Sequence, residues 1–140
     1  MENRMKLKLM MLVFWVTLPA FAEGNRSDQW IEPKDGVVRA WNNDYPIFTG
    51  VARVRYSKSD ASLTYAVKME KGQDAVQTIV DFYKGKTIAG FTIGDFVRRD
   101  DFMPDAQGFS TGKKQRGKGL SIFLIPQGND VVIYIHPNKQ

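Results

Sequence analysis

Cysteine is absent from this chain of 140 residues, and histidine occurs once. Without a thiol, the protein has no disulfide, no CxxC redox site, no Cys-ligated zinc and no lipid anchor on cysteine. A single imidazole also excludes metal sites that need two histidines. The remaining composition is ordinary, with 43% hydrophobic and 25% charged residues. It fits one small globular domain that is held together by core packing.

Long hydrophobic runs are equally scarce, and the one that stands out lies near the N-terminus. Residues 9–18 are apolar except for Thr17, and basic residues precede them at positions 4, 6 and 8. Ala20-Phe21-Ala22 then forms the A-x-A pattern at which signal peptidase cleaves. The alternative is an uncleaved membrane anchor, but residues 7–22 span 16 positions where a membrane-spanning helix needs about 20. We therefore predict a secretory signal peptide over residues 1–22, no transmembrane segment after its cleavage, and a periplasmic or secreted bacterial protein.

The net charge is also small once this leader is removed. The whole chain has 20 basic and 15 acidic residues, and the leader contains three of the basic and one of the acidic ones. Residues 23–140 therefore carry 17 basic and 14 acidic residues, a net charge of +3. A nearly balanced domain gives little electrostatic attraction for nucleic acid, which we do not expect as a partner.

The first part of the mature chain, residues 23–46, is polar and rich in turn-forming residues. We predict a partly ordered N-terminal arm there, with a short edge strand over residues 37–40. Trp30 and Trp41 have two interpretations: they form a recognition surface, because exposed aromatic residues are common interface anchors, or they pin the arm to the core. Residues 47–140 form the single domain that follows.

Two periodicities organise this domain. Apolar residues alternate with polar ones over residues 52–56 and 63–69, which predicts an antiparallel hairpin with Arg53, Arg55 and Lys68 on its solvated face. From residue 76 to 83 the apolar positions follow a helical spacing, with Asp74 as N-cap. Gly85 or Gly90 could end this helix, and we expect it to end at Gly90.

The rest of the chain alternates between apolar and polar stretches. Phe91 and Ile93 resume a strand-like alternation that continues to Phe96 and Val97 past a bulge or kink at Gly94. Residues 100–118 form a polar stretch that we expect to be a long loop or hairpin tip. Residues 120–125 and 131–135 are apolar on both faces, which is typical of strands in the middle of a sheet or of strands covered on both sides. The predicted fold class is α+β, an antiparallel sheet of about five strands with one main helix packed on one face, in the order β-β-α-β-β-β.

One resemblance follows from these elements. The strand over residues 63–69, the helix with Val80-Asp81-Phe82-Tyr83 and the exit Gly90-Phe91 resemble small exported bacterial α+β domains of unknown function. In those domains a helix with V-x-F-Y ends at a glycine followed by Phe or Trp. The similarity covers residues 45–136. It implies the fold and no activity, so it assigns no functional residue.

The sharpest local feature is a group of four cations in six positions, Lys113, Lys114, Arg116 and Lys118. Between two strands, such a group is a candidate site for a protein or an anionic envelope component, bound through charge and backbone donors. The second interpretation is a solvated loop whose charges keep a sheet edge from pairing with neighbours.

Catalytic patterns are missing. Asp95, Asp100, Asp101 and Asp105 form an acidic group, but they lack the order of a calcium loop, and no G-x-S-x-G motif accompanies His136. We therefore assign no catalytic residue, metal or cofactor. The sequence favours a non-catalytic exported binding domain, with two alternatives: a small secreted hydrolase that uses the aspartates and His136, or a structural subunit of an envelope assembly.

Overall fold

A computed structural model describes residues 28–68, 74–111 and 119–137 of the protein. The predicted leader, residues 1–22, lies outside these ranges. The elements in chain order are β1 (Asp28–Ile31), β2 (Val37–Ala40), β3 (Asn43–Pro46), β4 (Val54–Ser57), β5 (Ser62–Lys68), α2 (Ala75–Tyr83), β6 (Thr87–Ile88), β7 (Phe91–Thr92), β8 (Val97–Arg98), β9 (Gln107–Ser110), β10 (Leu120–Gln127) and β11 (Asp130–Pro137).

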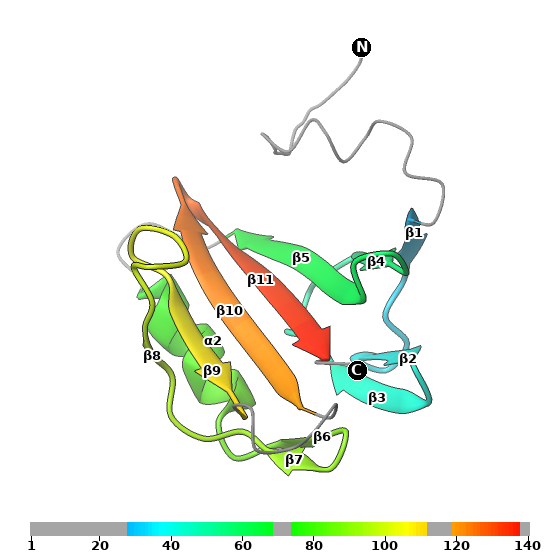
Figure 1. Ribbon diagram of the computed structural model, residues 1–140. Helices are drawn as coiled ribbons and strands as arrows, with labels where there is room; N and C mark the ends of the chain where they lie inside the picture. The colour runs from blue at the N-terminus through cyan, green and yellow to red at the C-terminus, as the bar shows by residue number, and fades with distance from the viewer. Residues whose placement is uncertain (1–27, 69–73, 112–118, 138–140) are drawn as a thin grey trace.

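A seven-stranded sheet dominates the structure, in the order β1-β4-β5-β11-β10-β9-β8 (Figure 1). All of its neighbouring strands pair antiparallel. Of the described residues, 51% lie in strands and 9% in the helix. The predicted α+β class with about five strands is therefore wrong: the protein is mostly β, with one short helix among the described residues and seven strands in the main sheet.

The strands that the sequence did not indicate lie toward the two edges of this sheet. β1 falls in the polar arm, and β9 falls in the polar stretch expected to be a loop. β1 stands at one edge, and the outer side of β9 pairs only with the two-residue strand β8, so both need few apolar residues and their alternation is weak. β9 is therefore a strand because it pairs with β10, although its own sequence shows no strand pattern.

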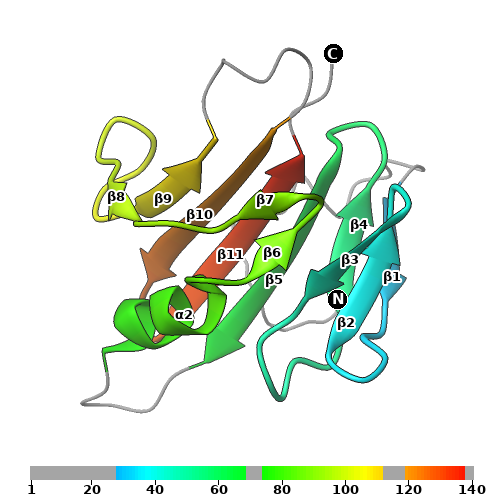
Figure 2. The same ribbon diagram turned by 90° about the horizontal axis from the view of Figure 1, so that it is seen from below.

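The main sheet has one covered face and one open face. Helix α2, the β6–β7 hairpin and the β2–β3 hairpin all lie over the same face, which we call the inner face (Figure 2). Ile79 and Tyr83 of α2 are fully buried there, in one core cluster with Ile122 of β10 and Ile133 of β11. Within the described ranges, the opposite outer face carries no helix or hairpin (Figure 1).

The start of α2 agrees with the sequence, but its end does not. The Asp74 carboxylate accepts a hydrogen bond from the Gln77 backbone at 3.0 Å, as expected of an N-cap. The helix ends at Tyr83, not at Gly90. Ala89 and Gly90 instead form the two-residue turn of the β6–β7 hairpin, with φ of 53° and 87°. Positive φ at both central positions is the geometry of a type I′ turn, which glycine favours.

Two buried tyrosines tie the N-terminal region to the helix. The Tyr65 and Tyr83 hydroxyls lie 2.5 Å apart, and Tyr83 donates to the Pro46 carbonyl at 2.8 Å. The Phe48 backbone N–H donates to the Tyr65 hydroxyl at 3.1 Å. Because the Tyr83 hydroxyl donates its only proton to the Pro46 carbonyl, it accepts the hydrogen bond from the Tyr65 hydroxyl. Burial raises the pKa of Tyr65 to about 12 and that of Tyr83 well above its ordinary value.

The described part of the predicted arm, residues 28–46, also contributes to the fold. β1 joins the edge of the main sheet, and the strand predicted over residues 37–40 is present as β2, paired with β3. Val38 and Tyr45 of this hairpin are buried in the core cluster. Residues 28–46 therefore supply part of the inner layer and one edge strand.

Candidate functional site

The predicted basic site, Lys113, Lys114, Arg116 and Lys118, lies outside the described residues, but the strands that flank it are described. Ser110 of β9 is opposite Ser121 of β10. Beyond this pair, the Thr111 N–H donates to the Leu120 carbonyl and the Leu120 N–H donates to the Thr111 Oγ1, each at 3.1 Å. Residues 112–118 therefore connect the ends of two strands that stay paired up to that connection.

Charge is unevenly divided between this segment and the described body. The described residues contain 10 Lys and Arg against 12 Asp and Glu. Residues 113–118 contain four cations and no acidic residue. The body is therefore slightly acidic, and the basic group is concentrated in one short connection.

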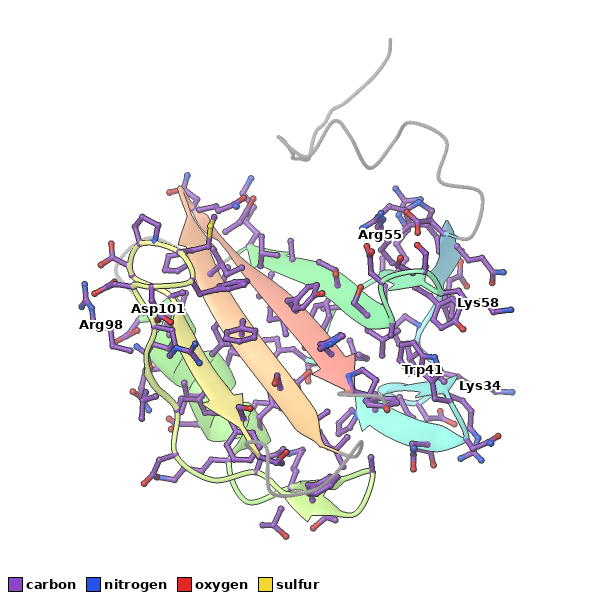
Figure 3. The ribbon with its side chains drawn as sticks, in the orientation of Figure 1. Lys34, Trp41, Arg55, Lys58, Arg98 and Asp101 are labelled. Carbon is purple, nitrogen blue, oxygen red and sulfur yellow. The ribbon has the colours of Figure 1, made fainter. Side chains whose placement is uncertain are left out.

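Trp30 and Trp41 lie in different environments. The Trp41 ring packs against the rings of Tyr45 and Tyr56, with centroids 5.9 and 5.2 Å away, so it holds the β2–β3 hairpin against the sheet (Figure 3). Trp30, on the edge strand β1, is 56% exposed, and the Arg53 guanidinium lies 4.2 Å from its ring centroid. Of the two, Trp30 presents its ring to solvent.

Arg55 does not lie on a solvated face as the alternation of its strand predicted. Its side chain is only 8% exposed and forms an ion pair with Asp28. The prediction was wrong because β1 is the neighbour of β4, and it brings a carboxylate beside the guanidinium. A buried charge needs such a partner to offset its desolvation.

Three aspartates of the predicted hydrolase site form ion pairs with arginine side chains and do not face one another across a cleft. Arg98 donates to Asp100 at 2.6 Å and to Asp105 at 2.7 Å, and Arg99 holds both oxygens of Asp101 at 2.9 Å (Figure 3). Hydrogen bonds from these arginines lower the pKa of Asp100 and Asp101. A general acid needs a raised pKa, so this arrangement suits charge pairing better than acid catalysis.

Asp95 follows the same pattern at a different place. It pairs with Lys84, just beyond α2, at 2.9 Å, and the hydrogen bond from this lysine lowers the pKa of Asp95. Within the described ranges, no group of three or more His, Asp and Glu side chains is placed to hold a metal ion.

The backbone of residues 99–106, which we call the 99–106 loop, is closed by its own hydrogen bonds. The Arg99 N–H donates to the Ala106 carbonyl at 2.8 Å, and the Ala106 N–H donates to Met103 at 3.1 Å. The Asp105 N–H donates to the Asp100 carboxylate at 2.8 Å. This ordered loop leaves Phe102 42% and Met103 38% exposed. Neither residue belongs to a predicted site, although two large apolar residues directly after Asp100 and Asp101 could have indicated an exposed contact.

His136, the other residue of the predicted hydrolase site, lies on β11 opposite Ser121. Its Nδ1 is 2.9 Å from the Ala61 carbonyl oxygen. A carbonyl can only accept a hydrogen bond, so Nδ1 carries the proton, and in the neutral ring Nε2 carries the lone pair. The ring lies beside that of Tyr134, with centroids 6.1 Å apart and planes 22° from parallel.

Residues on the outer face line up across the whole main sheet. Successive strand partners form one unbroken row: Trp30, Arg55, Thr64, Tyr134, Phe123, Gly108 and Val97. Of these, Tyr134 and Phe123 on the central strands are half-buried. The exposed Trp30 stands at one edge of the row and the exposed Val97 at the other.

The described part of the chain contains no helix with the length and hydrophobicity needed to cross a membrane. Comparison of the chain with family models, with curated proteins and with solved structures finds no match.

Proposed function

We propose that this chain is an exported bacterial binding domain without a catalytic role, which holds an anionic partner of the cell envelope through Lys113, Lys114, Arg116 and Lys118. The observation that supports it is the division of charge: a slightly acidic body, and four cations in one connection between two paired strands. Export rests on the predicted leader, residues 1–22.

Charge division favours this function over simple solubility. A solvated surface needs cations spread among anions, and the described body has that mixture already. Four cations within six residues give a local positive potential that attracts phosphate or carboxylate groups, and salt screens this attraction within about 8 Å at physiological ionic strength. Binding should therefore weaken steeply as salt rises.

The hydrolase alternative has less support. Its aspartates are paired with Arg98, Arg99 and Lys84, and the Nδ1 of His136 is used on a backbone carbonyl. The structural-subunit alternative rests on the two edges of the main sheet, β1 and β8, which could pair with another chain.

The test is charge reversal in the mature chain, with Lys113→Glu, Lys114→Glu and Arg116→Glu combined. We expect at least a tenfold loss of binding to sedimented bacterial envelopes at low salt, and a much smaller dependence on salt. The matched control reverses three exposed lysines of the body, Lys34, Lys58 and Lys68, in the same way. If the segment variant binds with unchanged affinity and salt dependence, the proposed function is wrong.

A further inference from the structure

Four rings follow one another on the outer face of the sheet. The ring centroids of Phe102 and Phe123 are 4.3 Å apart, those of Phe123 and Tyr134 6.4 Å, and those of Tyr134 and His136 6.1 Å. We call these four residues the aromatic row. They come from the 99–106 loop, β10 and β11, so three separate parts of the chain converge on one surface.

Gly108 makes room for the base of this row. A Cβ atom at Gly108 would lie 2.7 Å from the Cδ1 atom of Phe123, closer than real side chains approach. The Phe123 ring therefore rests over the backbone of β9, and Phe102 stacks on it with planes 16° from parallel. Glycine within a strand often marks such a close approach. The result is a supported stack whose top ring, Phe102, is the exposed one.

The loop that carries Phe102 is ordered before any ligand arrives. Arg98 and Arg99 bind its three aspartates, and its backbone hydrogen bonds close it. The conformational entropy of the Phe102 side chain and its loop is therefore lost during folding and not on binding. Sites that are preorganised in this way bind with higher affinity. The same pairing offsets two of the three carboxylates beside the row, which reduces their repulsion of an anionic ligand.

The row also offers hydrogen-bonding groups at its ring edges. The Tyr134 hydroxyl, which also forms a hydrogen bond with Ser62, keeps capacity for a further one, and in the neutral ring of His136 Nε2 is an acceptor. Flat apolar faces next to donors and acceptors match a sugar ring, which has a C–H face and hydroxyl groups at its rim. A purely aliphatic surface would lack both features.

The His136 end of the row lies close to the strand ends that the basic segment connects, whereas Phe102 comes from the loop at the opposite end of β9. His136 is opposite Ser121, and Ser121 is opposite Ser110, two residues before the segment 112–118. A polymer held at that connection by charge would therefore reach the aromatic row along β10 and β11.

We infer that the aromatic row is a sugar-binding platform and that the partner is an acidic polysaccharide of the cell wall. The acidic character of the partner rests on the proposed function, whereas the sugar chemistry rests on the aromatic row alone. Phe102 is the main contact, and Tyr134 and His136 extend the platform.

The experiment measures binding of the mature chain to three polymers. They are cell-wall polysaccharide purified from the producing organism, the same polysaccharide with its carboxylates amidated, and polyglutamate, which has carboxylates but no sugar rings. We expect Phe102→Ala to lower affinity for both polysaccharides about tenfold, the effect of one lost stacking contact, and to leave polyglutamate binding within about twofold. Phe102→Tyr should restore binding, and Tyr134→Ala should repeat the loss.

The control is Met103→Ala, which removes an exposed side chain of the same loop that has no ring. If folded Phe102→Ala and Tyr134→Ala bind polysaccharide like the unchanged chain, or if the unchanged chain binds neither polysaccharide, the platform is wrong. Equal losses with Met103→Ala and Phe102→Ala would also overturn it, in favour of a protein partner. If the Lys113, Lys114 and Arg116 reversal has no effect while Phe102→Ala does, the proposed anionic partner fails and the platform stands.

Discussion

On the inner face of the main sheet, most side chains are aliphatic or aromatic and buried in the core, whereas the outer face combines half-buried rings with buried polar groups, among them Ser57, Ser62 and the Arg55–Asp28 ion pair. Consecutive residues of β11 show the contrast, because Ile133 is 0% exposed and Tyr134 beside it faces out next to Phe123. Strand side chains alternate between faces, so one strand supplies both kinds of surface. The inner face holds the hydrophobic core, and the outer face carries the residues of the proposed platform.

The largest expected effect tests that division on neighbouring positions. Ile133→Ala opens a cavity in the inner core and should lower the free energy of unfolding by about 2–5 kcal/mol. Val132→Ala, on the half-buried outer face, should lower it by about 1 kcal/mol. Denaturant unfolding of both variants measures the difference. Equal losses would mean that the outer face is covered like the inner one.

Alkaline pH should act on the inner face next. Tyr65 has its pKa raised from 10.0 to about 12 because burial favours the neutral phenol. Its contribution is therefore complete below pH 10 and is lost as pH rises from 10 toward 12, by about 3 kcal/mol for two pKa units. Absorbance of tyrosinate and circular dichroism, followed together, should change in one transition above pH 10. Ionisation of every tyrosine near pH 10 with the fold intact would contradict the buried pair.

A smaller effect is expected on the outer face from Gly108→Ala. The added methyl would displace the Phe123 ring, which should cost about 1–3 kcal/mol in unfolding free energy and disturb the Phe102 stack. The matched control is Gly94→Ala, whose Cβ would lie at an ordinary 3.7 Å from Phe109. Denaturant unfolding and near-ultraviolet circular dichroism compare the two. If both variants behave alike, Gly108 does not support the aromatic row.

Local sequence patterns were sufficient to predict the elements whose own apolar residues form the core. Alternation predicted β5, the apolar runs predicted β10 and β11 in the middle of the sheet, and the spacing from Val76 to Tyr83 with Asp74 as N-cap predicted α2. In each of these elements, the side chains that pack into the core can be identified from the local sequence pattern.

Local patterns failed where a residue depends on a distant partner. β1 and β9 are strands because β4 and β10 pair with them, and Arg55 is buried because Asp28, 27 positions earlier, neutralises it. The aromatic row was missed for the same reason: Phe102, Phe123 and Tyr134 are far apart in sequence and meet only through the register of the sheet. The basic group, by contrast, is contiguous in sequence, so the sequence alone was enough to propose it, and its role stays a prediction.

The order of the main sheet also has a consequence for assembly. Strands β1, β4 and β5 form one half and β11, β10, β9 and β8 the other, and within the sheet the halves meet only along β5 and β11, from Asp130 opposite Lys68 to Ile135 opposite Leu63. β11 follows all the other described strands in the chain. The seam therefore closes only after residues 130–137 have been made, and a chain cut before residue 130 would keep two half-sheets with open edges, the state most prone to aggregation.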